Sequence, residues 1–122
     1  MTWRITDRAT FEELRKSGRR SRYGPVSVVF MPDGGERPRV AYAVGRRVGS
    51  AVTRNRLRRR MRAIVRGIEL AEGLRAGAYL VVPRPETSEL DHESLTKALR
   101  EAMRRAQTEA QTEKALRGGG ER

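Results

Sequence analysis

The chain has 122 residues and a formal net charge of +12, from 27 Lys and Arg against 15 Asp and Glu. This length allows one domain with one modest core, and this charge is typical of proteins that bind polyanions. The absence of cysteine excludes disulfides, thiol catalysis and cysteine-ligated zinc. No apolar run reaches membrane-spanning length and the N-terminus lacks the apolar core of a signal peptide, so we expect a soluble, cytoplasmic protein.

The N-terminal part of the chain predicts a helix followed by strands. Asp7 is a candidate N-cap for a helix that runs to about Ser17, and Gly18 is placed to end it. A short extended piece over residues 20–23 follows. The run Val26–Met31 is rich in β-branched residues and predicts a strand.

The middle of the chain predicts a hairpin and a long helix. Residues 32–35 read Pro-Asp-Gly-Gly, a turn sequence, so we expect the strand at 40–44 to pair back onto the strand at 26–31. Ser50 is a candidate N-cap for a helix that runs to about Arg66.

The C-terminal part predicts a strand, a helix and a tail. Residues 76–83 are mostly apolar, which indicates a central, covered strand. A last helix begins near Asp91 or His92 and continues to about Ala106. We therefore predict one domain over residues 1–106 and a disordered polar tail over 107–122. The order of elements predicts an α/β (α+β) sandwich, with helices against one central sheet.

The predicted second helix is the most basic part of the chain. Between Arg37 and Ile68 there are eleven arginines and no Asp or Glu. At about 100° per residue, one stripe of the helix is apolar and would pack on the sheet: Leu57, Met61, Ile64, Val65 and Ile68. Arginines cover the rest of its surface, and Arg46 and Arg47 extend the charge toward its N-terminus. Like charges at this spacing destabilise a helix, so the pattern indicates a nucleic-acid partner.

RNA is the nucleic acid that the sequence favours. No helix-turn-helix, zinc or zipper pattern is present to set the register on duplex DNA. A membrane-surface role is disfavoured because the apolar stripe has no Trp or Phe. Asn55, an amide among guanidinium groups, can contact a base edge or a sugar, and its alternative is a solvated helix residue. No protein partner is predicted.

Two aromatic residues suggest a second binding feature. Phe11 lies on the first helix and Phe30 on the first long strand. If that helix packs across the sheet, both rings would line one groove rimmed by Arg15 and Arg19, suited to single-stranded nucleic acid. The alternative for each ring is core packing, which spacing alone favours.

No catalytic site is predicted in this chain. The only histidine, His92, lies at a helix start, and Glu12 and Glu13 are neighbours that point to different sides of a helix. No pair of candidate metal ligands is suggested by spacing. Phosphodiester hydrolysis needs charge stabilisation and an activated water, typically through metals, so an auxiliary role is expected.

The segment from Val44 to Arg62 closely resembles the protein subunit of bacterial ribonuclease P. That family's Arg-Asn-Arg motif stands here as Arg54-Asn55-Arg56, preceded by a basic pair, a glycine and Ala-Val. The resemblance extends more weakly from the helix that holds Phe11 to about Ala106.

The resemblance implies both a fold and an activity. The fold would be an α-β-β-β-α-β-α sandwich with a left-handed βαβ crossover. The holoenzyme would be an endonuclease that removes the 5′ leader from precursor tRNA. Its RNA subunit, with bound magnesium, would be the catalyst, and no cofactor is expected on the protein alone.

The resemblance also implies roles for individual residues. The residues that dock on the RNA subunit would be Arg46, Arg47, Arg54, Asn55, Arg56, Arg58, Arg59 and Arg62. Phe11 and Phe30 match aromatic residues of the family's central cleft, which holds the single-stranded leader. Arg15 replaces a second aromatic residue there, so a guanidinium platform or a phosphate contact would take the place of stacking.

A structural RNA-binding protein of ribosomal type is the alternative. Composition does not separate the two functions. Only the segment around Arg54-Asn55-Arg56 favours the ribonuclease P subunit.

Overall fold

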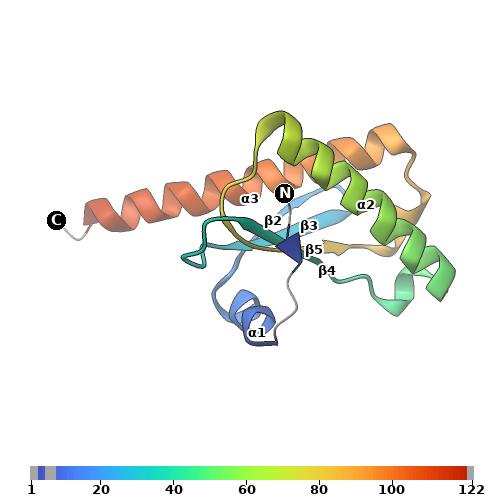
Figure 1. Ribbon diagram of the computed structural model, residues 1–122, viewed down its shortest axis with the longest axis horizontal. Coiled ribbons are helices and arrows are strands. Elements are labelled where there is room, and N and C mark those ends of the chain that lie inside the picture. Colours follow the sequence, from blue (N-terminus) through green and yellow to red (C-terminus); the bar gives the residue numbers. More distant parts are fainter. Residues whose placement is uncertain (1–2, 5–7, 121–122) are drawn as a thin grey trace.

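The computed structural model describes the backbone of residues 3–4 and 8–120, and side chains over residues 8–108. Along the chain lie β1 (Trp3–Arg4), α1 (Arg8–Ser17), β2 (Arg19–Tyr23), β3 (Val26–Met31), β4 (Pro38–Tyr42), α2 (Ala51–Glu72), β5 (Gly77–Pro83) and α3 (His92–Gly120), with short 3₁₀ turns at Arg46–Val48 and Pro85–Glu89. One sheet separates α2 and α3 on one face from α1 on the other (Figure 1). The expected α/β sandwich is confirmed, with β1 as an additional short strand.

The order of strands corrects one prediction. The sheet runs β1-β4-β5-β3-β2, so β5 lies between β3 and β4, and the predicted hairpin of residues 26–31 with 40–44 is wrong. Nearly every position of β5 is buried, and a strand that is apolar on both faces gains most from a central place. The hairpin partner of β3 is β2, reached through Gly24 at φ 58°.

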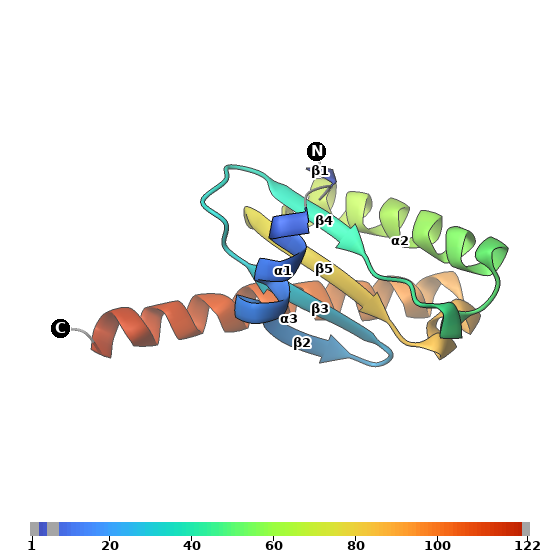
Figure 2. The ribbon, with the colours of Figure 1, turned by 90° about the horizontal axis from the view of Figure 1, so that it is seen from below.

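The connection from β4 to β5 is an uncommon crossover. These two strands are parallel neighbours, and α2 joins them. Figure 2 shows them from the α1 side, pointing the same way, with α2 behind. Seen instead from the α2 side with the strands upward, β5 lies to the left of β4, so the crossover is left-handed. About 98% of such connections are right-handed, and the resemblance implied this exception.

Two apolar clusters hold the layers together. The larger one fills the space between the sheet and α2 with α3, while the smaller one joins α1 to the opposite face through Leu14, Val29 and Leu80. Gly18 ends α1 as predicted, and its N–H donates to the carbonyl of Leu14 at 3.0 Å. A Cβ there would collide with that carbonyl and with Val29. The proposed cap Asp7 lies outside the described residues.

Two helices are longer than predicted. Helix α2 continues past Arg66 because Ile68 extends the buried stripe, and it ends at Gly73, whose φ is 79°. Helix α3 continues to Gly120, where a disordered tail was expected from residue 107. Residues 107–117 are mostly strong helix formers such as Ala, Gln, Glu and Lys, whereas the three glycines at 118–120 are not. The buried face of α3 includes Ala106, where the domain was predicted to end.

Candidate nucleic-acid interface

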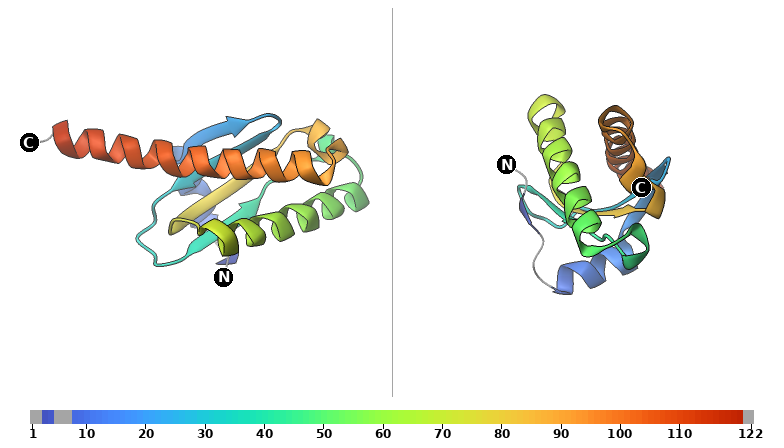
Figure 3. Two further views of the ribbon diagram at one scale, coloured as in Figure 1. Left: turned by 90° about the horizontal axis from the view of Figure 1, so that it is seen from above. Right: turned by 90° about the vertical axis from the view of Figure 1, so that its right-hand side faces the viewer.

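Helix α2 is held to the core by its predicted apolar stripe. Its buried residues are Leu57, Met61, Ile64, Val65 and Ile68. The side chain of Ser50 caps the helix and accepts a hydrogen bond from the Thr53 N–H at 3.3 Å, as predicted. Helix α2 lies beside α3 above the sheet (Figure 3). Because the apolar stripe faces inward, the arginines between its members are directed sideways or outward.

Several arginines of this region have no partner in the described part of the protein. The guanidinium groups of Arg46, Arg47, Arg56, Arg59 and Arg66 are exposed and make no hydrogen bond or ion pair there. Arg54 is half-buried, and its buried Nε also has no hydrogen-bond partner. Positive charge without compensation raises the local potential and attracts a polyanion.

Other arginines of α2 are tied to the protein. Arg60 donates to the carbonyl of Leu90 at 2.6 Å, which links α2 to the end of the 3₁₀ turn that precedes α3. Arg58 donates to Oδ1 of Asn55 at 2.8 Å. The Asn55 amide is therefore not simply solvated, because its oxygen orients Arg58 and its two N–H donors are left for another acceptor.

Eight residues were predicted to bind the RNA subunit, and the structure places all of them on one connected segment. Arg46 and Arg47 lie in the 3₁₀ turn that precedes α2, and the other six lie on α2 itself. Arg62 stands apart from the others because its guanidinium lies over the ring of Tyr42, 5.9 Å from the ring centre.

The face of the sheet that carries α1 contains a groove. Helix α1 covers only one end of this face (Figure 2). A hollow of about 370 Å³ lies beside it, lined by Leu14, Arg15, Gly18, Arg20, Val29, Ala43, Leu80 and Val82. Val29 and Leu80 give it an apolar floor, and the exposed Arg15 and Arg20 stand at its rim.

The prediction that Phe11 and Phe30 line one groove is wrong. Phe30 is fully buried on the opposite face, with its ring centre 4.6 Å from that of Tyr79. Phe11 is half-buried and packs on the smaller cluster beside α1. Side chains alternate along a strand, so Val29 faces the groove and Phe30 faces the main core. For Phe30 the alternative of core packing is correct.

The same register corrects the rim of the groove. Arg19 pairs with Phe30 and Arg20 pairs with Val29. Residues directly opposite in an antiparallel pair share a face, so Arg20, and not the predicted Arg19, lies on the groove side. The sequence carried no signal for this choice, because both faces of β3 are apolar.

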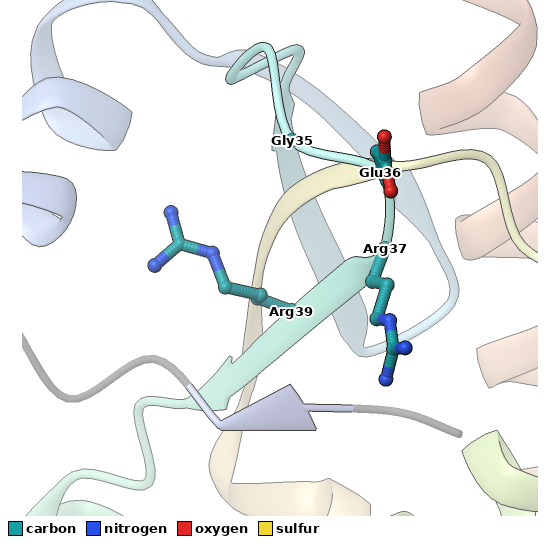
Figure 4. A pocket seen from close by; sticks show the side chains of 4 residues that line it. All are labelled: Gly35, Glu36, Arg37 and Arg39. Atoms are coloured by element: carbon teal, nitrogen blue, oxygen red, sulfur yellow. The ribbon is translucent and has the colours of Figure 1, made fainter.

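A second hollow, of about 430 Å³, lies where the β3–β4 loop enters β4. Gly35, Glu36, Arg37 and Arg39 line it, and the side chains of Arg37 and Arg39 project in different directions from the chain (Figure 4). Arg39 donates to Asp33 at 2.8 Å and to Thr10 at 3.4 Å. Burial alone would raise the pKa of Asp33, but the hydrogen bonds from Arg39 and Gly35 lower it below its usual value. These contacts fasten the β3–β4 loop to α1.

Within residues 8–108, whose side chains are described, no group of three or more His, Cys, Asp or Glu residues is placed to hold a metal ion. His92 is exposed at the first residue of α3, and Glu12 pairs with Arg8 at 3.7 Å.

In the part of the chain that the structure describes, no helix combines the length and apolarity needed to span a membrane.

Comparison with known proteins gives one consistent result. A family model described as Ribonuclease P matches residues 1–107. The ribonuclease P protein component of Thermobifida fusca is 36% identical over 105 residues, covering 79% of this chain and 70% of that protein. The component of Thermus thermophilus is 42% identical over 89 residues, covering 73% of this chain and 50% of that protein, so the match spans half of the Thermus protein's length.

Solved structures share the fold. The ribonuclease P protein of Thermotoga maritima superposes with a TM-score of 0.73 at 26% identity, covering 84% of this chain and 96% of that one. A mutant of the Staphylococcus aureus protein gives a TM-score of 0.79 at 20% identity, covering 86% of this chain and 88% of that one.

Proposed function

This chain belongs to the ribonuclease P protein family, whose members are subunits of a tRNA-processing endoribonuclease, and from that premise we propose how it works. The exposed face of α2 and the turn before it bind the catalytic RNA subunit. The groove beside α1 binds the single-stranded 5′ leader of precursor tRNA. The family match favours this function over that of a ribosomal-type protein.

Binding of the RNA subunit by α2 is supported by the arginines along this helix that have no partner within the described residues. Arg56 and Arg59 are exposed, make no ion pair within the described residues, and lie on a helix fixed by its buried stripe. A guanidinium group can bind phosphate bidentately. A rigid helix presents several of these groups together, which suits a folded RNA more than a flexible tail would.

The shape and lining of the groove beside α1 support binding of the 5′ leader there. Its apolar floor at Val29 and Leu80 suits the faces of unpaired bases, and Arg15 and Arg20 can contact the phosphates that link them. Phe11 packs next to this floor and stays a candidate for stacking through its exposed part. Phe30 is not included, because it is fully buried.

Catalysis is assigned to the RNA. We infer from the family that the RNA subunit would hold the magnesium, which would supply activation of the attacking water, while this chain holds substrate and RNA together. The cytoplasm, where precursor tRNA is processed in bacteria, is the proposed location.

Reconstitution tests this function. The protein is added to a bacterial ribonuclease P RNA at low magnesium, and cleavage of precursor tRNA is followed against the RNA alone. We expect the protein to restore cleavage at the mature 5′ end. A preparation that binds RNA in general but does not restore cleavage would instead indicate a structural RNA-binding protein.

A further inference from the structure

Tyr42, at the end of β4, contacts both the main core and an arginine of α2. It is half-buried, packs on the main core, and pairs with Val81 of the central strand β5. Its ring lies on the α2 side of the sheet, where the guanidinium of Arg62 lies over it at 5.9 Å from the ring centre. The ring thus connects the sheet to the basic surface of α2.

Arg62 itself stays available to a ligand. It is exposed and makes no hydrogen bond or ion pair within the described residues. A cation–π contact uses the charge of the guanidinium and not its N–H groups, so the donors of Arg62 remain available to phosphate oxygens. Arg60 is the opposite case, because its donor is used by the Leu90 carbonyl.

The Tyr42 ring stays uncharged over the physiological pH range. Burial raises the pKa of the Tyr42 phenol, and the nearby positive charge of Arg62 only partly opposes that shift. The side chain therefore stays neutral and presents a constant π face. Its hydroxyl makes no hydrogen bond within the described part of the protein, so the contact with Arg62 depends on the ring.

We propose that Tyr42 is a positioning residue, whose ring holds the guanidinium of Arg62 in the orientation that contacts a phosphate of the RNA subunit. This inference rests on the proposed binding of that RNA by α2. A free arginine side chain loses rotamer freedom when it binds, and a side chain already held in place loses less. The benefit appears as affinity for RNA, and Tyr42 itself need not touch the RNA.

A double-mutant cycle tests this proposal with a readout that a merely structural role would not produce. The affinity of the full chain for ribonuclease P RNA is measured for wild type, Tyr42→Leu, Arg62→Ala and the double variant. A cation–π contact at an exposed site corresponds to about a two- to fivefold change in affinity. We expect Tyr42→Leu to lose that factor in the wild-type background and to lose nothing further once Arg62 is alanine.

Two controls sharpen the cycle. Tyr42→Phe keeps the ring and should restore most of the affinity. In an Arg59→Ala background, Tyr42→Leu should still show its full loss, because Arg59 does not contact the ring. Circular dichroism and thermal melting establish that each variant is folded, and Tyr42→Met replaces the leucine variant if the latter is unfolded.

The outcomes separate this inference from the function on which it rests. An equal loss from Tyr42→Leu with and without Arg62, or no loss in either background, would overturn the positioning role while RNA binding by α2 stands. If the wild-type chain does not bind the RNA subunit, or if replacing Arg56 and Arg59 has no effect on binding, the proposed function fails and the role of Tyr42 fails with it.

Discussion

The outer face of α2 and the groove beside α1 are both basic, but they are built differently. On α2 the arginines project from a rigid helix, several of them make no ion pair within the described residues, and the apolar stripe that supports them is buried. In the groove the floor is apolar and largely buried, and the arginines stand only at its rim. The first arrangement suits a folded RNA with fixed phosphates, and the second suits flexible nucleotides whose bases are free. Binding to α2 should therefore depend strongly on salt, and binding in the groove should depend on it less.

The largest expected effect tests which aromatic ring belongs to the groove. Phe30→Ala removes a fully buried ring that contacts Tyr79, so it should lower the free energy of unfolding by about 3–5 kcal/mol. Urea unfolding measures this loss. Phe30→Leu keeps most of the volume and should bind precursor and mature tRNA in the wild-type ratio. A selective loss of precursor binding in the folded leucine variant would return Phe30 to the groove.

The second prediction concerns the exposed charges of α2. Charge-assisted hydrogen bonds contribute about 1.5 kcal/mol each, so Arg56→Ala with Arg59→Ala should weaken binding of the RNA subunit on the order of a hundredfold. The slope of log affinity against log salt should flatten by roughly 1.4, or roughly 0.7 for each lost phosphate contact. Binding titrations across a salt series measure both.

Arg60→Ala is the matched control on the same helix. This residue donates to the Leu90 carbonyl, so its loss should reduce stability by about 1.5 kcal/mol and leave the salt slope near that of wild type. Arg60→Ala and the double variant could instead flatten the slope of log affinity against log salt by the same amount. In that case Arg60 contacts RNA as Arg56 and Arg59 do, and its bond to Leu90 does not set it apart.

The third prediction concerns the groove. Arg15→Ala with Arg20→Ala removes two exposed rim charges, each contributing about 0.5–1 kcal/mol, so precursor tRNA should bind roughly tenfold more weakly. Mature tRNA lacks the leader and should be unaffected. An equal loss for both substrates would place these arginines on the tRNA body instead of the leader.

The smallest expected effect concerns Asn55. Asn55→Ala releases Arg58 from the 2.8 Å hydrogen bond that orients it, which should weaken binding of the RNA subunit by about two- to fivefold. Asn55→Asp keeps an acceptor for Arg58 but removes the N–H donors and adds a negative charge. If the aspartate variant binds as well as wild type, the amide makes no donor contact with RNA.

The basic helix could be predicted from the sequence because its apolar and basic residues alternate within one short segment. Leu57, Met61 and Ile64 recur at helical spacing among arginines, so both the buried stripe and the exposed face follow from one short segment. The predicted end of the helix near Arg66 was too early: Ile68, already assigned to the apolar stripe, lies inside α2, which continues to Glu72.

The groove was only partly accessible because it depends on long-range pairing. The strand β3 is apolar on both faces, so its sequence does not state whether Val29 or Phe30 faces α1. That choice is made by the register with β2 and by the insertion of β5. Arg60 gave no local signal of its separate role either, because its partner Leu90 lies thirty residues further along the chain.

The central place of β5 also has a consequence for how the protein is made. Until Pro83 has been synthesised, β2–β3 and β4 have no strand to bridge them, and non-local pairing of this kind slows folding. Helix α2 emerges from the ribosome before β5, so its arginines appear before the sheet that will support them is complete. The nascent chain is thus strongly cationic while unfinished, and a truncated product that ends before β5 should attract RNA without the specificity of the native surface.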